Sequence, residues 1–371
     1  MQLSLDVLIS MPSSQSTDNQ PTSSTDQPIE LIPEQKASIP CLAFWPDGSR
    51  LIAVVGSGLQ IWNIRQKIRE GEAIRGGFST NFTTVAVSTD GKKFATGGTY
   101  RDGGQVSLWD SNSRRIEHTF DKPAISRCLC VVHFSSDTRL LAYAFEREYM
   151  SDSLEVRNAA DGNSVCVLEP RKGNTRCTRF SPDDTRLAAC GVCIQIWELA
   201  TGRPSLEIKH RAHSLEWTKD GSHVIANNLA NGQFMMYDAR TGAQIRSWRE
   251  RAGGVTAPQL WPYICMSVSP DGRFLASVRG NTVHVWDLEN AKEVTWYSFP
   301  RDMFCVAYSP KGDYIASGSY ICKVPKEPPV RCPHRISAIR THSCVLYRLT
   351  MSVFHCHDVV PVFIGHDSIL L

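Results

Sequence analysis

The chain has 371 residues, of which 42% are hydrophobic and 21% are charged, with a formal net charge of +3 at pH 7. This composition can bury large cores, but no apolar run reaches eighteen residues, so a membrane-spanning helix is not expected. The first ten residues lack Lys and Arg and contain Asp6, which argues against a secretory signal. We therefore expect an intracellular protein, either cytoplasmic or nuclear.

Residues 1–36 form a segment of distinct composition. Residues 11–36 are rich in Ser, Thr, Gln, Pro and Asp and have few branched or aromatic side chains. Such a segment cannot bury enough surface to offset its chain entropy, so we expect a disordered N-terminal arm. Within this arm, the apolar stretch from Ile29 to Ile32 could supply an outer strand to the domain that follows.

A sequence repeat fills residues 37–320, which we expect to form one domain. In its first copy, the short apolar run Cys41 to Phe44 precedes the turn Pro46-Asp47-Gly48, and Leu51 to Val55 follows it. Pro, Asp and Gly favour a tight turn, so the two runs are predicted to be strands of a hairpin. The alternating segment Leu59 to Asn63 then predicts a third strand.

The turn recurs seven times along the chain. Its copies are Pro46-Asp47-Gly48, Thr89-Asp90-Gly91, Ser136-Asp137-Thr138, Pro182-Asp183-Asp184, Lys219-Asp220-Gly221, Pro270-Asp271-Gly272 and Pro310-Lys311-Gly312. Successive copies lie 37 to 51 residues apart. This period is typical of a four-stranded propeller blade and is too long for ankyrin or tetratricopeptide repeats.

Six of the seven copies also end their third strand with an aromatic or long residue followed by a polar one. The pairs are Trp62-Asn63, Trp109-Asp110, Arg157-Asn158, Trp197-Glu198, Tyr237-Asp238 and Trp286-Asp287. With the Asp-Gly turns, these pairs resemble the WD-repeat family. The resemblance implies an all-β propeller of about seven blades, the seventh incomplete or irregular, with Trp62, Trp109, Asp110, Trp197, Tyr237, Trp286 and Asp287 as structural repeat positions. The family's Gly-His pair is missing from these units, which suggests that packing alone holds the blades.

Residues 321–371 depart from the repeat and form an irregular tail that contains Cys and His residues. The stretch Lys323 to Pro329 holds three prolines and is not expected to supply the third strand of blade seven. Near the end, Gly365-His366-Asp367 resembles the start of a further repeat. The tail is interpreted as interrupting sequence from altered splicing, and a genuine specialised tail is the alternative.

Several residues could carry chemistry, but none fits a site. Cys190-Gly191-Val192-Cys193 has redox or half-zinc spacing, yet it has no nearby second pair. The tail residues Cys332, His334, His342, Cys344, Cys356 and His357 match no zinc-ligand spacing. We therefore expect no metal, no cofactor and no catalytic residue. His210 and His213 precede a first strand, and one of them is expected to be a diverged structural histidine.

The resemblance implies that loops joining second to third strands, and fourth strands to the next blade, share one face that binds partners. The candidate partner-binding residues on it are Tyr100, Arg101, Arg147, Glu148, Tyr149, Arg171, Arg211, Arg251 and Arg301, and Tyr and Arg are enriched at interface hot spots. Solvated loop residues are the alternative for this set.

The expected function is a non-catalytic scaffold or peptide-binding platform whose partners are other proteins or peptides. Residues 1–320 are balanced in charge, which gives no reason to expect a nucleic acid, and no membrane partner is expected. The oligomeric state stays open. The alternatives are a lactonase-type or hydrolase-type propeller enzyme and an incomplete gene product without separate activity.

Overall fold

The computed structural model describes the ring of repeats and parts of both flanking segments. Its described residues are 29–30, 39–75, 80–100, 103–123, 130–145, 154–170, 175–228, 232–249, 265–324, 338–341, 344–347 and 362–363. Every regular element in them is a β-strand, and none forms a helix long and apolar enough to cross a membrane.

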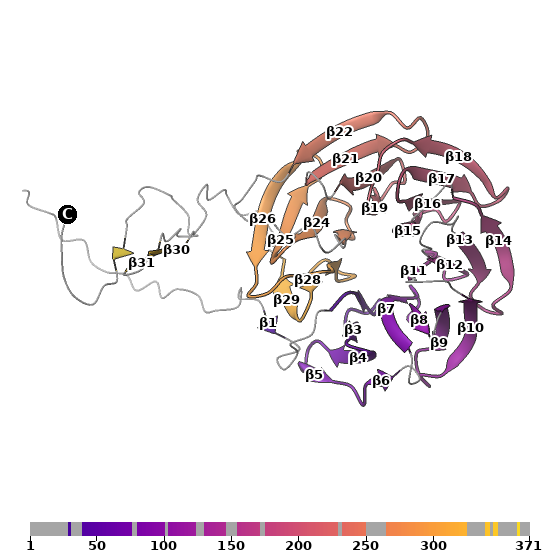
Figure 1. Cartoon of the computed structure of the whole chain (residues 1–371), viewed down its shortest axis with the longest axis horizontal. Helices are drawn as coiled ribbons and strands as arrows, with labels where there is room; N and C mark the ends of the chain where they lie inside the picture. Colours follow the sequence, from indigo (N-terminus) through magenta and orange to yellow (C-terminus); the bar gives the residue numbers. More distant parts are fainter. Residues whose placement is uncertain are drawn as a thin grey trace, which may run out of the picture.

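Seven antiparallel sheets surround a central axis as the blades of a β-propeller (Figure 1). Blade one contains β2 (Leu42–Phe44), β3 (Arg50–Val55), β4 (Gly58–Asn63) and a split outer edge of β5 (Ile68–Arg69) and β6 (Ile74–Arg75). Blade two contains β7 (Thr80–Val87), β8 (Lys93–Tyr100), β9 (Gly103–Asp110) and β10 (Ile116–Pro123). Blade three contains β11 (Cys130–Phe134), β12 (Leu140–Phe145), β13 (Leu154–Asn158) and β14 (Ser164–Leu168).

The next blades repeat the same order from the inner to the outer strand. Blade four contains β15 (Cys177–Phe180), β16 (Arg186–Cys190), β17 (Ile194–Glu198) and β18 (Arg203–Ile208). Blade five contains β19 (Ser214–Trp217), β20 (His223–Asn228), β21 (Gln233–Asp238) and β22 (Gln244–Arg249). Blade six contains β23 (Met266–Val268), β24 (Phe274–Arg279), β25 (Thr282–Asp287) and β26 (Lys292–Ser298). The predicted all-β propeller is confirmed.

Blade seven is the irregular one, because its strands come from two distant parts of the chain. It contains β27 (Ala307–Tyr308), β28 (Tyr314–Ser317), β29 (Tyr320–Lys323) and, as its outer strand, β1 (Ile29–Glu30). Ile29 pairs with Ile321, and Glu30 pairs with Tyr320. The possible closing strand in the N-terminal arm is thus confirmed. The expectation that blade seven lacks a third strand is wrong, because β29 ends at Lys323, before the first proline of the tail.

The tail contributes three short strands that pair only with one another. They are β30 (Ala338–Thr341), β31 (Cys344–Tyr347) and β32 (Val362–Phe363), in a sheet of their own.

The turn between the first and second strands explains the strongest signal in the sequence. In five units a Ser or Thr hydroxyl donates to the Asp two residues later: Ser88 to Asp90, Ser135 to Asp137, Ser181 to Asp183, Thr218 to Asp220 and Ser269 to Asp271. The third turn residue has a positive φ in all seven units, which Gly adopts without strain. Thr138 and Asp184 adopt positive φ angles of 67° and 56°, so the turn geometry is kept in the two units that lack Gly at this position.

Three of the structural repeat positions donate indole hydrogen bonds, two of them to the neighbouring second strand and one within the third strand itself. The Trp109 indole donates to the Thr96 hydroxyl at 2.9 Å, and that of Trp286 donates to Ser277 at 3.0 Å. The Trp62 indole donates to Gln60 at 3.3 Å. The expectation that packing alone holds the blades is therefore wrong, because these Trp donors find side-chain partners within the same blade.

The polar members of the Trp-Asp pairs build the turns to the fourth strands. Asp110 accepts from the Ser113 N–H at 2.7 Å, and Asp287 accepts from the Glu289 N–H at 2.9 Å. In blade three, Arg157 takes the Trp position and pairs with Glu155 at 2.7 Å. An ion pair thus replaces the aromatic donor where the repeat is degenerate.

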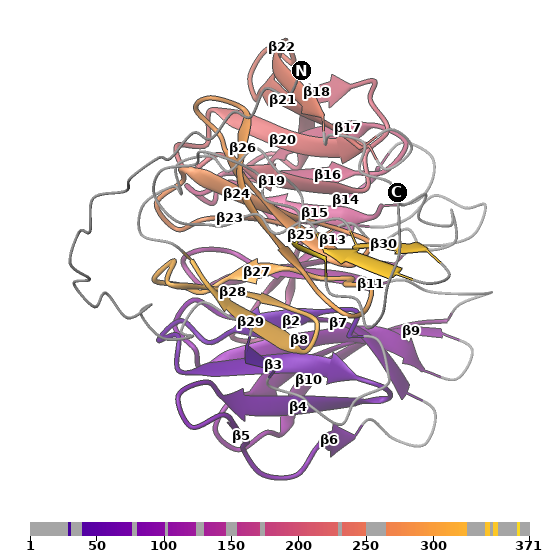
Figure 2. The same ribbon diagram turned by 90° about the vertical axis from the view of Figure 1, so that its left-hand side faces the viewer.

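The hydrophobic cores lie between neighbouring blades. One cluster joins blades three and four through Leu154, Phe180 and Trp197, and another joins blades four and five through Ile194 and Trp217. The two rims of the ring are formed by different connections. Figure 2 shows the β27–β28 turn on one side and the β8–β9 end of blade two on the other. We call these sides the turn face and the loop face.

Candidate functional site

The central channel is lined by the seven inner strands, whose inner edges pair with no other strand in the described parts of the chain. Side chains from the preceding blade bond to these edges at several positions. The Val85 N–H donates to Cys41 Sγ at 3.4 Å, the Phe180 N–H donates to His133 Nδ1 at 3.4 Å, and the Tyr308 N–H donates to Ser267 Oγ at 3.1 Å. Backbone groups that a sheet leaves open are thus partly satisfied across the blade junctions.

One ion pair bridges the inner strands of blades four and five. Arg179 Nε lies 2.9 Å from Glu216 Oε1, and the two side chains are 22% and 16% exposed. Burial raises the pKa of Glu216 to about 7, more than the Arg179 charge lowers it. Burial and the charge of Arg179 lower the pKa of His133 to about 3. This part of the channel therefore carries a cation beside a carboxyl that titrates near neutrality and an uncharged imidazole.

The cysteine pair of the Cys190-Gly191-Val192-Cys193 segment is not a unit in the structure. Cys190 instead faces Cys177 in direct register across β15 and β16, and both are buried. The hydrogen bond with Cys190 lowers the pKa of Cys177, and burial raises that of Cys190. Within the described parts of the chain, no group of three or more His, Cys, Asp or Glu could hold a metal ion.

His210 and His213 lie in the loop between β18 and β19, as expected from the sequence. His210 Nε2 and His213 Nδ1 are both buried and have no hydrogen-bond partner in the structure. Burial and the nearby Arg176 and Arg211 lower the pKa of His213 to about 4. The structural role expected for one of them stays a prediction.

Two members of the predicted partner-binding set can be placed with their side chains. Arg211 and Arg301 are exposed, and both lie on connections from a fourth strand to the next inner strand, β18 to β19 and β26 to β27. The side chain of Tyr100, at the end of β8, is not described. Arg101, Arg147, Glu148, Tyr149, Arg171 and Arg251 lie outside the described residues.

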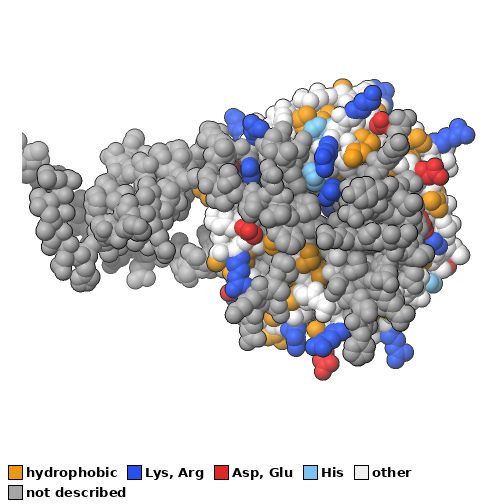
Figure 3. All heavy atoms as spheres, viewed as in Figure 1, with side chains coloured by type: hydrophobic (Ala, Val, Ile, Leu, Met, Phe, Trp, Pro, Cys, Tyr) orange, Lys and Arg blue, Asp and Glu red, His pale blue; other side chains and the backbone are white. Residues whose placement is uncertain are grey.

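Figure 3 views the ring as in Figure 1 and shows Lys, Arg and His side chains among the described atoms of this face. Arg211 acts electrostatically on His213, as does Arg176, which precedes β15. Two arginines, Arg176 and Arg211, thus lie near His213 at the junction of blades four and five.

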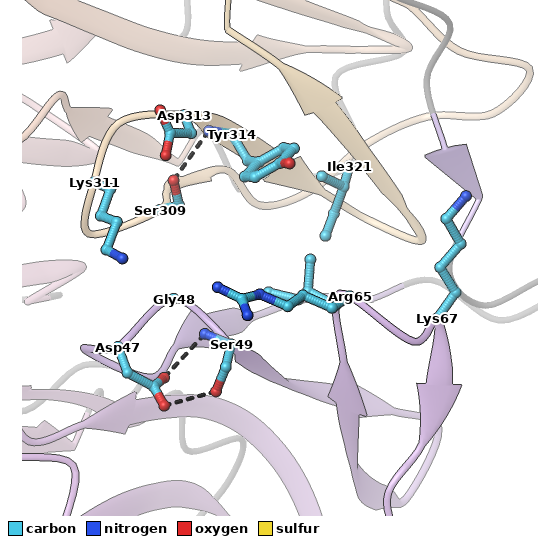
Figure 4. Close-up of a pocket in the computed structure, with 11 residues that line it drawn as sticks. Asp47, Gly48, Ser49, Arg65, Lys67, Ser309, Lys311, Asp313, Tyr314 and Ile321 are labelled. Carbon is cyan, nitrogen blue, oxygen red and sulfur yellow. Dashed lines mark hydrogen bonds between the residues drawn. The ribbon is translucent and has the colours of Figure 1, made fainter. Parts of the chain in front are cut away.

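A second candidate surface, which sequence reasoning missed, is a groove where blade seven meets blade one. We call it the seam groove. It has a volume of about 430 Å³ and is lined by Asp47, Gly48, Ser49, Ile64, Arg65, Lys67, Ser309, Lys311, Asp313, Tyr314 and Ile321 (Figure 4). Its residues come from the first turn and the β4–β5 connection of blade one, and from the turn and strands of blade seven. Segments so far apart in the sequence carry no common signal, apart from the Lys that replaces Asp in the seventh turn.

The charged side chains of the seam groove differ in the number of partners that they contact. Asp47 accepts from the Ser49 N–H at 2.9 Å and from the Ser49 hydroxyl at 2.6 Å. Partial burial acts to raise the pKa of Asp47, but these hydrogen bonds outweigh it and lower the pKa. Arg65, Lys67 and Lys311 are exposed, and no ion pair found among the described residues includes them. The groove is thus lined by three cations that form no ion pair with another described residue.

Comparison with known proteins agrees with the blade architecture. A family model described as "WD domain, G-beta repeat" matches residues 260–287, which include β25 and its Trp286-Asp287 pair. Protein groucho of Drosophila melanogaster is 25% identical over 174 residues, which cover 44% of this chain and 23% of groucho. Transducin-like enhancer protein 2 of Mus musculus is 23% identical over 184 residues, which cover 47% of this chain and 23% of that protein. The matched part thus spans less than a quarter of each relative.

Proposed function

Because this chain is a WD-repeat protein of the β-propeller class, we propose that it is a non-catalytic scaffold that binds a partner protein or peptide on its loop face. A propeller suits this role because its strands fix the loops on a rigid ring, so that residues distant in sequence act together on one surface. The proposal includes an intracellular location, cytoplasmic or nuclear, as expected from the sequence.

The observation that carries the proposal is the equivalence of the Arg211 and Arg301 loops. Both arginines are exposed and follow a fourth strand, so the ring places them on the same face. An exposed Arg can form paired hydrogen bonds and stack on an aromatic ring of a partner, which makes it a frequent anchor of protein interfaces. The predicted loop residues Tyr100, Arg101, Arg147, Glu148, Tyr149, Arg171 and Arg251 are proposed to extend this surface.

Affinity capture from the native cell tests the proposal, with partners identified by mass spectrometry. The full chain is compared with the double variant Arg211→Ala/Arg301→Ala and with the triple variant Arg101→Ala/Arg147→Ala/Tyr149→Ala. Both variants should lose the main partner. The thermal unfolding of Arg211→Ala/Arg301→Ala should stay close to that of wild type, because exposed substitutions change stability little.

A matched control removes two exposed arginines from the turn face. Arg203 and Arg240 flank the connections between third and fourth strands of blades four and five. Arg203→Ala/Arg240→Ala should leave capture intact. If this control loses the partner while the loop-face variants keep it, the partner binds the turn face and the proposed surface is wrong.

A further inference from the structure

The seam groove lies where the propeller ring is closed without a covalent link. Its walls are the turn at Asp47 and the β4–β5 connection of blade one, and the turn at Lys311 and strand β29 of blade seven. Ile321, one of its lining residues, pairs with Ile29 of the closing strand β1. A ligand in this groove would therefore contact both blades that the closure brings together.

Two positive side chains, Arg65 and Lys311, approach each other from opposite walls of the groove. Figure 4 shows the Arg65 guanidinium in the gap between the blades, on the side of Lys311, whereas Lys67 lies at the other end of the groove and points away from them. These cations have no carboxylate partner among the described residues, whereas Lys93, Arg157 and Arg179 are each paired with a glutamate. Unpaired cations on facing walls repel each other, and a bound anion would remove that repulsion.

We propose that the seam groove binds a phosphorylated side chain of a partner protein. A phosphate monoester carries close to two negative charges at neutral pH and offers three strong acceptor oxygens. The fork of Arg65 can take two of these oxygens, and the ammonium group of Lys311 acts as a point charge beside the third. Tyr314, which lies across the groove from Arg65, adds a phenol hydroxyl to the wall (Figure 4).

The two carboxylates of the groove favour a single compact anion over a polyanion. Asp47 lies on the blade-one turn and Asp313 on the blade-seven turn, and both side chains are exposed. The backbone of a nucleic acid or an anionic membrane surface would place further negative charge against these carboxylates. One phosphate group on a flexible peptide can enter between them, and the groove volume of about 430 Å³ is within the range of small-ligand pockets.

Binding here would also tighten ring closure. Among the described residues, the closing strand contributes the pairs Ile29–Ile321 and Glu30–Tyr320. A phosphate held by Arg65 of blade one and Lys311 of blade seven adds a second link across the same junction. Because a ligand that binds only the folded state stabilises it, the phosphopeptide should raise the melting temperature of the protein.

The test passes a peptide library with degenerate flanks and a central phosphoserine, phosphothreonine or phosphotyrosine over the immobilised full chain. An unphosphorylated copy of the library is the reference. The best retained sequence is then measured by fluorescence anisotropy at 0.15 M salt. We expect the phosphorylated form to bind at least about tenfold more tightly than the unphosphorylated form, since charge-assisted bonds to phosphate are strong.

The double variant Arg65→Glu/Lys311→Glu should weaken phosphopeptide binding at least about tenfold, because it reverses the two cations that face each other across the groove. The matched control Arg203→Glu/Arg240→Glu carries the same charge change elsewhere on the turn face, on blades four and five, and should bind like wild type. Circular dichroism and thermal unfolding establish that both variants fold.

Four outcomes would overturn the inference: retention of both libraries alike, undiminished binding by Arg65→Glu/Lys311→Glu, tighter binding of duplex DNA, or tighter binding of phosphatidylserine vesicles. The inference stands apart from the loop-face proposal. Arg211→Ala/Arg301→Ala should keep the phosphopeptide while losing the captured partner, so failure of one proposal is distinguishable from failure of the other.

Discussion

The junction between blades four and five differs sharply from the junction between blades seven and one. At the first, Arg179 pairs with Glu216, the Trp217 indole donates to the Arg179 carbonyl at 3.0 Å, and Arg186 donates to the Gly221 carbonyl at 2.8 Å. At the second, the Cys305 thiol donates to the Ile39 carbonyl at 3.2 Å, and the seam groove separates the turns.

The difference follows from how each junction is made. Blades four and five are consecutive in the chain, so their contacts form between segments that a short loop already holds together. Blade seven contacts both blade one and the arm strand β1, and these segments are separated from it by almost the whole length of the chain. Forming these contacts therefore costs more loop-closure entropy than forming contacts between consecutive blades. Both junctions have a buried hydrophobic cluster, so they differ in their polar contacts and in the chain length that each contact closes. The seam is therefore the junction at which a ligand or a truncation of the arm can act directly.

The largest expected effect is the loss of Trp217, which is 4% exposed at the junction of blades four and five. Trp217→Ala removes its packing in the core, its bond to the Arg179 carbonyl and its contact with the Arg186 guanidinium, which lies 4.8 Å from the ring centroid. Such a truncation should lower the free energy of unfolding by about 3–5 kcal/mol, measured by urea denaturation. A loss below about 1 kcal/mol would show that Trp217 contributes little to this junction.

The second prediction concerns the pH dependence of the same junction. Glu216 has a folded pKa of about 7, above the ordinary value of 4.5, so the folded state binds its proton more tightly. Its contribution is therefore greatest below about pH 4.5 and is lost as the pH rises through about 7. Glu216→Gln should remove this loss. Between about pH 4.5 and pH 7, the free energy of unfolding of the variant should therefore rise more steeply with pH than that of wild type. The difference in slope is at most about 1.4 kcal/mol per pH unit, and contact of the side chain with solvent reduces it.

His133 and His213 act in the opposite direction, because their folded pKa values of about 3 and about 4 lie below 6.5. They favour the folded state as the pH rises towards 6.5. Urea denaturation between pH 4.5 and 7.5 separates the contributions, with the exposed Glu289→Gln as control. If Glu216→Gln and Glu289→Gln give the same pH profile as wild type, Glu216 ionises as an ordinary glutamate.

The third prediction tests the closing strand. Two truncations, one beginning at residue 29 and one at residue 31, differ only by the strand β1. Loss of β1 removes two backbone pairings, each hydrogen bond contributing about 0.5–1.5 kcal/mol, so the shorter form should be about 1–3 kcal/mol less stable. It also exposes the edge of β29, so sedimentation should show more self-association. Equal stability of the two truncations would mean that β1 is not needed to close the ring.

The sequence predicted the regular blades because each carries its own local signals. The turn at Asp90 and the pair Trp109-Asp110 belong to one continuous segment, and their spacing is set by strand and turn geometry. The Ser or Thr before the turn Asp, as at Ser88, is an equally local signal that was overlooked. The third strand of blade seven was missed because β29 has no Trp-Asp pair and lies next to prolines.

The candidate sites were harder to predict than the fold. The seam groove combines residues near positions 47, 65 and 311, and only ring closure brings them together. The cross-strand pair Cys177 and Cys190 likewise depends on strand register, whereas the sequence pointed to Cys190 and Cys193. Most of the predicted loop-face residues lie outside the described residues, so their role stays a prediction.

The smallest expected effect belongs to the seam cations themselves. Arg65→Ala/Lys311→Ala removes two exposed charges that contribute to no ion pair among the described residues, so the free energy of unfolding should change by less than about 0.5 kcal/mol at 0.15 M salt. Because like charges on facing walls repel over about 10 Å or more at low ionic strength, the variant should gain stability relative to wild type when the salt is lowered.

Urea denaturation at two salt concentrations measures this difference, with Arg203→Ala/Arg240→Ala as the control for loss of positive charge elsewhere on the turn face. A destabilisation above about 1 kcal/mol would exceed what exposed, unpaired side chains contribute. The cations would then be holding the seam together through contacts of their own, and they would not be free to receive an anion.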